Sequence, residues 1–223
     1  MRRITGSAFL SLDGVMQAPG APGEDWTGGF EYGGWLPPYT DDAVGEAVGN
    51  LLSGSYDLLL GRKTYEIFAA YWPYYDEAGE NGGIAAPFNR AAKYVLTRNA
   101  DQPLDWANSH RLADIGALSS LKQTDGPDLI IQGSSTIYPA LLEAGLLDRL
   151  ITLTFPILLG KGKRLFGAET SARALRMIDH RVSPRGVVIA HYEPAGPVET
   201  GCFAGPEQSE REKARQDRMR REG

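Results

Sequence analysis

The sequence has one cysteine, Cys202, and only three histidines among its 223 residues. A single cysteine excludes an intrachain disulfide and any cysteine-based metal cluster. His110, His180 and His191 lie far apart and lack the close spacing of zinc ligands. We therefore expect no metal site in this chain.

Long hydrophobic runs and an excess of basic charge are also missing. No segment approaches the roughly 18 consecutive apolar residues of a membrane-spanning helix. The apolar stretch after Arg2 and Arg3 ends at Leu10, which is too short for a signal peptide. We therefore expect a cytoplasmic protein with no membrane partner. The net charge of −5 argues against non-specific binding to nucleic acid, which needs a basic surface.

The chain does contain an alternation of apolar segments and helical patterns. Hydrophobic residues make up 42% of it, enough to bury a full core. The pattern predicts strands over residues 4–12, 56–60, 93–96, 129–131, 150–158, 174–182 and 187–192. It predicts helices over residues 41–52, 62–71, 115–121 and 134–144, with an irregular stretch over 72–87.

This order of elements predicts an α/β fold of three layers. We expect a mostly parallel central sheet with helices on both faces and a C-terminal antiparallel hairpin. One domain is expected over residues 1–193. Residues 194–223 form a polar tail, which we expect to be disordered or an isolated helix.

A glycine-rich loop over residues 14–38 carries the aromatic residues Trp26, Phe30, Tyr32 and Trp35. Long loops of this kind are often lids or binding loops. An ordered surface loop whose aromatic side chains cover the core would have the same composition. The sequence leaves both interpretations open.

Polar, glycine-containing turns follow three of the predicted strands. Gly61, Arg62 and Thr64 come after strand 56–60, where glycine lets the backbone approach a ligand closely and a helix start favours phosphate. Thr97 and Arg98 come after strand 93–96, and a hydroxyl beside a guanidinium suits a phosphomonoester. A helix cap with exposed basic residues would look the same.

The third turn is Gln132, Gly133, Ser134, Ser135 and Thr136, after strand 129–131. Its hydroxyl residues open a helix, although the two serines are equally typical of structural caps. Because ligands of parallel sheets lie beyond the carboxyl ends of the strands, the three turns together predict a site for a dinucleotide phosphate. No GxGxxG motif occurs, so the Rossmann fingerprint is absent.

Five ordered motifs resemble the dihydrofolate reductase superfamily. They are SLDG at residues 11–14, GRKTYE at 61–66, YVLTR at 94–98, the QG turn leading to Tyr138, and PILLGKG at 156–162. The first and last resemble most the branch that contains the C-terminal reductase domain of the bacterial bifunctional riboflavin deaminase-reductase. The resemblance covers residues 4–192 and implies the dihydrofolate-reductase-like fold, NADPH as hydride donor and a homodimer paired through the late strands 150–158 and 187–192.

The resemblance also implies roles for single residues. Arg62, Thr97 and Arg98 would lie near the adenosine 2′-phosphate, Thr64 near the ribose and phosphates, and residues 133–137 under the pyrophosphate. The cofactor set is then Gly61, Arg62, Thr64, Thr97, Arg98, Gly133, Ser134, Ser135, Thr136 and Ile137. Trp35, Gln132 and Asp13 would face the substrate, with Tyr138 close to the nicotinamide and Asp41 beside the substrate.

The proton donor stays open at this point. Asp13, Asp41 and solvent are the candidates; we favour Asp13 as the catalytic residue, although it could equally serve only to shape the turn with Gly14. Folate reductases have a carboxylate shortly after a Leu-Pro pair, whereas Leu36-Pro37 is followed here by three other residues before Asp41. Gln132 stands where the riboflavin branch has a glutamate.

These features favour an NADPH-dependent oxidoreductase that transfers hydride to a C=N or C=O carbon of a small pterin- or aminopyrimidine-like heterocycle. The substrate would resemble those of dihydrofolate reductase and of 5-amino-6-(5-phosphoribosylamino)uracil reductase. The alternative is a catalytically weak protein that binds or sequesters an aromatic small molecule on the same fold. A scaffold whose exposed aromatic residues join subunits is a third interpretation.

Overall fold

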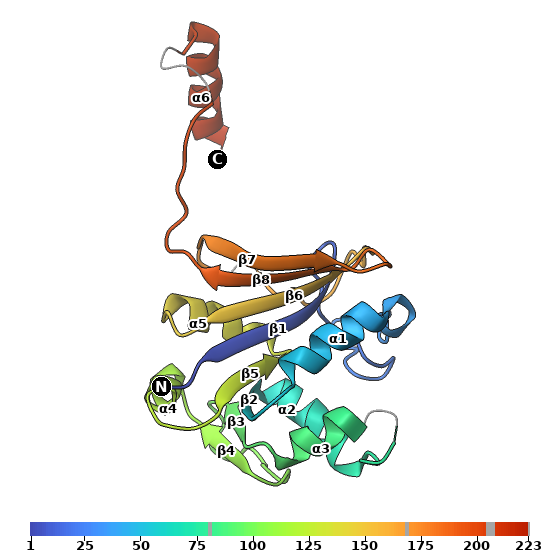
Figure 1. Cartoon of the computed structure of the whole chain (residues 1–223). Coiled ribbons are helices and arrows are strands. Elements are labelled where there is room, and N and C mark those ends of the chain that lie inside the picture. Colours follow the sequence, from blue (N-terminus) through green and yellow to red (C-terminus); the bar gives the residue numbers. More distant parts are fainter. Residues whose placement is uncertain (80–81, 168–169, 204–207, 223) are drawn as a thin grey trace.

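The computed structural model describes residues 1–79, 82–167, 170–203 and 208–222. Its strands are β1 (Ile4–Ser11), β2 (Tyr56–Gly61), β3 (Lys93–Leu96), β4 (Ser109–Leu112), β5 (Asp128–Gln132), β6 (Arg149–Phe155), β7 (Leu175–Val182) and β8 (Val188–Pro194). They form one eight-stranded sheet in the order β4-β3-β2-β5-β1-β6-β8-β7, drawn in Figure 1. The pairs from β4 to β6 are parallel, whereas β8 runs antiparallel to both β6 and β7.

Helices cover both faces of this sheet (Figure 1). They are α1 (Asp42–Leu51), α2 (Arg62–Ala69), α3 (Gly82–Arg90), α4 (Ile115–Lys122) and α5 (Tyr138–Glu143), with short 3-10 turns η1 (Pro37–Tyr39), η2 (Trp72–Tyr74) and η3 (Ser135–Ile137). A further helix, α6 (Glu210–Glu222), stands away from the sheet in Figure 1 and has no buried residue.

The central strands are apolar because they are covered on both sides. Every residue of β2 is buried, as expected for a parallel strand between two helical layers. On one face, α4 and α5 pack against β1 and β5 and make the first core, which includes Ile4, Leu118, Leu129 and Leu141.

The other face of the sheet carries two separate hydrophobic cores. The second core joins α1 to β1, β6, β8 and the glycine-rich loop through Val44, Leu153, Phe155, Ile189 and Trp35. The third core joins α2 and α3 to β2, β3 and β5 through Tyr65, Phe88, Leu58, Val95 and Ile130. Because β1 packs into the second core and β5 into the third, the boundary between the two cores lies between these neighbouring strands.

The structure confirms the predicted α/β fold with its mostly parallel sheet and late antiparallel strands. Two predictions about the middle of the chain are wrong. Residues 72–87, expected to be irregular, contain η2 and most of α3, because burial of Ala85 and Phe88 stabilises a helix that its glycines and Pro87 disfavour. Strand β4 was not predicted, since its two middle residues are exposed and it lies at the sheet edge.

A third difference concerns the predicted helix over residues 134–144. Ser134 has a left-handed backbone (φ 62°, ψ 54°), so the chain first makes the 3-10 turn η3 and the α-helix begins only at Tyr138. No helix in the described residues is both long enough and apolar enough to cross a membrane.

Candidate functional site

The three polar turns lie side by side at one edge of the sheet. Strands β3, β2 and β5 are neighbours and run parallel, so their carboxyl ends point the same way. Gly61, at the end of β2, is in register with Leu96, the last residue of β3. Residues that are far apart in sequence therefore meet where a ligand of an α/β sheet binds.

The turns after β2 and β5 are in direct contact. The amide of Gly61 donates a hydrogen bond of 2.7 Å to Oγ of Ser134. A Cβ atom on Gly61 would lie 3.2 Å from that oxygen, and one on Gly133 would lie 3.2 Å from Cγ2 of Thr64. Gly133 also has a positive φ of 82°. Any larger residue at either glycine would therefore fill the space between the two turns.

Hydrogen-bonding groups are available on this turn. Within the described residues, the hydroxyls of Ser135 and Thr136 have no partner and their backbone amides have no acceptor. Ser134 instead uses its hydroxyl to hold Gly61. Ile137 is a core residue, because its side chain packs in the first core and its amide donates to the carbonyl of Ser134 at 3.1 Å.

The two arginines of the predicted cofactor set differ in whether the guanidinium already has an acidic partner. Arg62 donates two hydrogen bonds, of 2.8 and 2.9 Å, to the carboxylate of Glu66 one helical turn later, so its charge is partly neutralised. The guanidinium of Arg98 is exposed and has no partner within the described ranges. Thr97 is buried and its hydroxyl accepts from the amide of Asn99 at 3.2 Å, which fixes the turn that carries Arg98.

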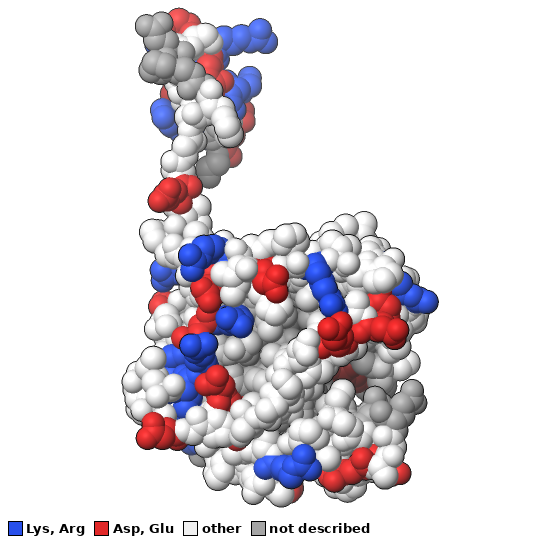
Figure 2. Space-filling view, viewed as in Figure 1, with Lys and Arg blue, Asp and Glu red and all other residues white. Residues whose placement is uncertain are grey.

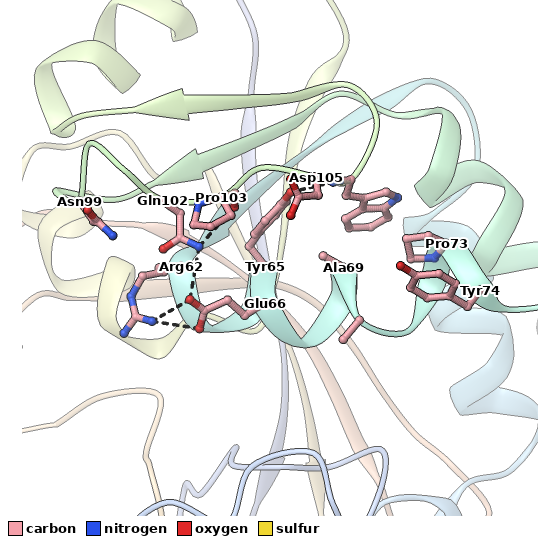
Figure 3. A pocket seen from close by; sticks show the side chains of 12 residues that line it. Arg62, Tyr65, Glu66, Ala69, Pro73, Tyr74, Asn99, Gln102, Pro103 and Asp105 are labelled. Atoms are coloured by element: carbon pink, nitrogen blue, oxygen red, sulfur yellow. Dashed lines mark hydrogen bonds and ion pairs between the residues drawn. The ribbon is translucent and has the colours of Figure 1, made fainter.

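A groove of about 560 Å³ runs along α2 from this edge of the sheet. Figure 3 shows Arg62 and Asn99 at one end and Tyr74 at the other, with Glu66 beside Gln102. Its walls are the outer side of α2 and the segment after β3; the lining residues are Arg62, Tyr65, Glu66, Ala69, Ala70, Pro73, Tyr74, Asn99, Gln102, Pro103, Asp105 and Trp106. No sequence pattern predicts this groove, because its residues come from separate segments without a common motif.

Charge on the rest of the surface is mixed. In the view of Figure 2, Lys and Arg lie among Asp and Glu, and neither sign forms a continuous patch on that face. Arg62, Lys63 and Arg98 are the cationic residues of these turns, and Arg111 donates from its guanidinium to the carbonyls of Asn99 and Arg98 at 3.0 and 3.3 Å.

Asp13, the expected catalytic residue, is held inside the turn that follows β1. Its carboxylate accepts from the Ser11 hydroxyl at 2.6 Å and from the amides of Leu159 and Gly160 at 3.1 and 2.9 Å, and it pairs with Arg164 at 3.5 Å. The hydrogen bond from Ser11 lowers the pKa of Asp13 most, against a smaller opposing effect of desolvation. The geometry favours the turn-shaping interpretation, since such a carboxylate is ionised and cannot give up a proton near neutral pH.

Asp41 is the N-cap of α1. Its carboxylate accepts from the amide of Val44 at 3.1 Å and from the amide of Arg185, in the β7–β8 turn, at 3.1 Å. Desolvation raises the pKa of Asp41, but hydrogen bonds from Ser183, Val44 and Arg185 outweigh it and leave the pKa below its usual value. The Asp41 side chain therefore links the start of α1 to the β7–β8 turn.

Two residues expected to face ligand pack in the hydrophobic cores. Trp35 is 6% exposed, its Nε1 donates to the carbonyl of Gln17 at 2.8 Å and its ring packs edge-on against Phe155. Tyr138 is fully buried beneath Gly6 in the first core, because the missing Cβ of that glycine leaves room for its ring. Both large side chains are placed by packing in the core, which the resemblance did not reveal.

Gln132 is the predicted substrate residue whose polar group is available. It ends β5, is only 7% exposed, and its amide has no hydrogen-bond partner within the described residues. The amide is not among the fully buried polar atoms without a partner, so it keeps some contact with solvent. The side chain therefore has the properties of a ligand contact.

The chain belongs to the RibD C-terminal domain family, whose model matches residues 2–189. Among curated proteins it is 25% identical over 134 residues to the uncharacterised protein YyaP of Bacillus subtilis (strain 168), which covers 59% of this chain and 70% of that protein.

Solved structures share the fold at lower identity. A provisionally assigned riboflavin biosynthesis protein from Shewanella sp. PV-4 superposes with a TM-score of 0.64 at 20% identity, covering 86% of this chain and 99% of the other. Dihydrofolate reductase from Enterococcus faecalis, complexed with NADP(H) and RAB-propyl, gives a TM-score of 0.54 at 15% identity, covering 86% and 96%. The family match confirms the suspected branch, and the solved structures show the dihydrofolate-reductase-like fold.

Proposed function

We propose that this protein is an NADPH-dependent reductase of a small pterin- or aminopyrimidine-like heterocycle. The observation that carries the proposal is the contact between the turns after β2 and β5. There the missing side chains of Gly61 and Gly133 let the two turns pack closely, with Ser134 against Gly61 and Thr64 against Gly133. Membership of the RibD C-terminal domain family supports a reductase.

The residues at this edge fit a dinucleotide phosphate. Free amides and hydroxyls at Ser135 and Thr136 would donate to the pyrophosphate, as backbone donors at such turns do. Arg98 would pair with the 2′-phosphate, because its guanidinium is not already neutralised within the described chain. Arg62 would contribute less, since Glu66 competes for it.

When bound, NADPH supplies the hydride that reduces a C=N or C=O carbon of the heterocycle. The protein's part is to orient the two reactants and exclude water, with Gln132 as the polar contact beside the sheet edge. Asp13 and Asp41 are both occupied as acceptors of structural hydrogen bonds. We infer that the proton that completes the reduction comes from solvent.

One observation favours the second candidate, a binding protein with little turnover. Neither carboxylate expected near the site is free to act as a proton donor, and slow proton delivery would leave a protein that binds its heterocycle and releases it unchanged. This candidate predicts tight heterocycle binding without consumption of NADPH.

The experiment compares NADPH consumption with heterocycle binding. We expect NADPH absorbance to fall faster when dihydropterins or aminopyrimidines are added to the purified chain, and we expect Gly133→Val to abolish this by displacing Thr64. Gly49→Val, where a Cβ would meet nothing within 4 Å, is the control in helix α1. Binding of a heterocycle without NADPH consumption would support the binding protein; failure to bind NADPH would refute the reductase.

A further inference from the structure

The groove along α2 lies over the third hydrophobic core. Its floor consists of Tyr65 and Trp106, which are only 2% and 4% exposed and belong to that core. The amide of Trp106 donates to the Tyr65 hydroxyl at 3.1 Å, and its Nε1 donates to Oδ1 of Asn89 at 2.9 Å, so the floor is fixed on two sides. The volume of about 560 Å³ is within the range of small-molecule sites, about 300–1,000 Å³.

The charged side chains that line the groove leave one carboxylate unpaired. The carboxylate of Glu66 accepts two hydrogen bonds from Arg62 and a third, of 3.3 Å, from the amide of Gln102, as drawn in Figure 3. Asp105 is exposed, and its carboxylate has no hydrogen bond or ion pair with any residue that the structure describes. One cation and two carboxylates line the groove, so its net charge is negative.

A further cation lies behind the floor, where it does not pair with Asp105. The ammonium of Lys93 is buried, 4.2 Å from the centre of the Trp106 ring, and donates to the carbonyls of Asn89 and Ala107 at 2.8 and 3.0 Å. A second cation on the same ring would be repelled by this one. An incoming cation would therefore use another aromatic side chain.

Tyr74 is the aromatic side chain that the groove offers. It ends η2 and is 83% exposed, although the neighbouring Trp72 packs against Phe68 and Phe88. Trp72 thus anchors the turn in the third core and leaves Tyr74 outside it. Figure 3 shows Tyr74 beside Pro73, at the end of the groove away from Arg62. An exposed ring and an unpaired carboxylate in one groove are groups that attract a cation.

We propose that the groove along α2 binds a small organic cation, which carries an ammonium group on a short apolar arm. The ammonium would pair with Asp105 and lie against the ring face of Tyr74. The apolar arm would pack on Ala69 and Pro73, which line the same groove. This inference goes beyond the proposed function, because neither Asp105 nor Tyr74 belongs to the three polar turns at the sheet edge.

The pairing of charges in the groove selects against other ligands. An anion is disfavoured because the guanidinium of Arg62, which would attract it, is already paired with Glu66. A neutral ligand would leave the Asp105 carboxylate without a counter-charge. The groove therefore distinguishes ligands by charge more than by shape.

Three probes of similar size test this preference. Phenethylamine is a cation at neutral pH, phenethyl alcohol is neutral and hydrocinnamate is an anion. Ligand-observed NMR titrations of the full chain measure the affinity of each. We expect phenethylamine to bind about three- to tenfold more tightly than phenethyl alcohol, the combined value of an exposed ion pair and a cation–π contact, and hydrocinnamate to bind least. Added salt should weaken the binding of phenethylamine and not that of phenethyl alcohol.

Paired variants locate the binding site. Asp105→Asn should weaken phenethylamine binding by about two- to fivefold. Asp101→Asn is its control, because Asp101 is an exposed carboxylate of the same segment that does not line the groove. Tyr74→Leu should weaken binding by a similar factor, about two- to fivefold. Its control is Tyr39→Leu, since Tyr39 ends η1 as Tyr74 ends η2 and is also exposed. Neither control should change the affinity.

Several outcomes would overturn the inference. They are equal affinity for phenethylamine and phenethyl alcohol, tighter binding of hydrocinnamate, and equal weakening in Asp105→Asn and Asp101→Asn. Tighter binding of N-acetyllysine methylamide than of phenethylamine would instead assign the groove to a protein side chain. NADPH binding, followed separately by tryptophan quenching, tests the proposed function alone. A chain that binds phenethylamine and not NADPH would keep this inference and refute the reductase.

Discussion

Replacing Gly133 by alanine tests the contact between the turns after β2 and β5. Two effects add at this position. The backbone has φ +82°, a left-handed conformation that costs a non-glycine residue roughly 1–2 kcal/mol. The new Cβ would also lie 3.2 and 3.3 Å from Cγ2 and Oγ1 of Thr64, and overpacking of this kind typically costs about 1–3 kcal/mol.

Gly145 offers a matched control for the first effect alone. It follows α5 with φ +64°, and a Cβ there would meet nothing within 4 Å. Gly145→Ala should therefore lower the free energy of unfolding by roughly 1–2 kcal/mol. Gly133→Ala should lower it by about 2–5 kcal/mol, the sum of strain and crowding.

Urea denaturation of the two variants measures the difference in stability, and tryptophan quenching by NADPH measures cofactor binding. We expect Gly133→Ala to weaken NADPH binding at least about tenfold, equivalent to 1.4 kcal/mol, because Thr64 is displaced. Gly145→Ala should leave binding unchanged. Equal losses of stability in the two variants, together with unaltered NADPH affinity, would refute the idea that the packing of Thr64 against Gly133 supports NADPH binding.

Three further predictions concern charge, pH and assembly. Arg98→Ala should weaken NADPH binding by about 1.5–3 kcal/mol and NADH binding much less, measured by titration of both; equal weakening would count against a 2′-phosphate contact. Burial lowers the pKa of Lys93 to about 8, against the opposing Asp57 carboxylate. Above about pH 8 the unfolded chain, in which this lysine keeps its ordinary pKa of 10.5, binds more protons than the folded chain. The free energy of unfolding should therefore rise between about pH 8 and 10.5, and this rise should be absent in Lys93→Met. We propose a homodimer through β7, the exposed edge strand with Ile178 on it, and expect Ile178→Lys to give monomers by light scattering.

The dimer surface proposed here differs from the one that the sequence suggested. Strands 150–158 and 187–192 were expected to form it, but β6 lies between β1 and β8, and β8 lies between β6 and β7, so neither has a free edge. Strand order depends on contacts between distant residues, which hydrophobic periodicity does not contain. The two-sided burial of β2 and β5 was predictable, because continuous apolar runs indicate central parallel strands.

Only part of the candidate site was predictable from the sequence. Glycine and hydroxyl residues at strand ends were predictable from local sequence, and the structure places Gly61, Thr64, Gly133 and Ser134 together. The partners of each charged group were not predictable, because they lie elsewhere in the chain. The carboxylate of Asp13, for example, accepts hydrogen bonds from a loop about 150 residues later.

The position of β1 in the middle of the sheet affects how this protein folds during synthesis. The amide of Arg3 bonds to Asp128 and that of Ile4 to Asp148, across 125 and 144 residues of chain. A ribosome therefore releases β1 long before either neighbouring strand exists, and closing loops of this length is slow. Until β5 and β6 emerge, the apolar faces of β1 stay uncovered. We expect a nascent chain halted before residue 128 to be captured by chaperones, and one extended well beyond residue 155 to become resistant to protease.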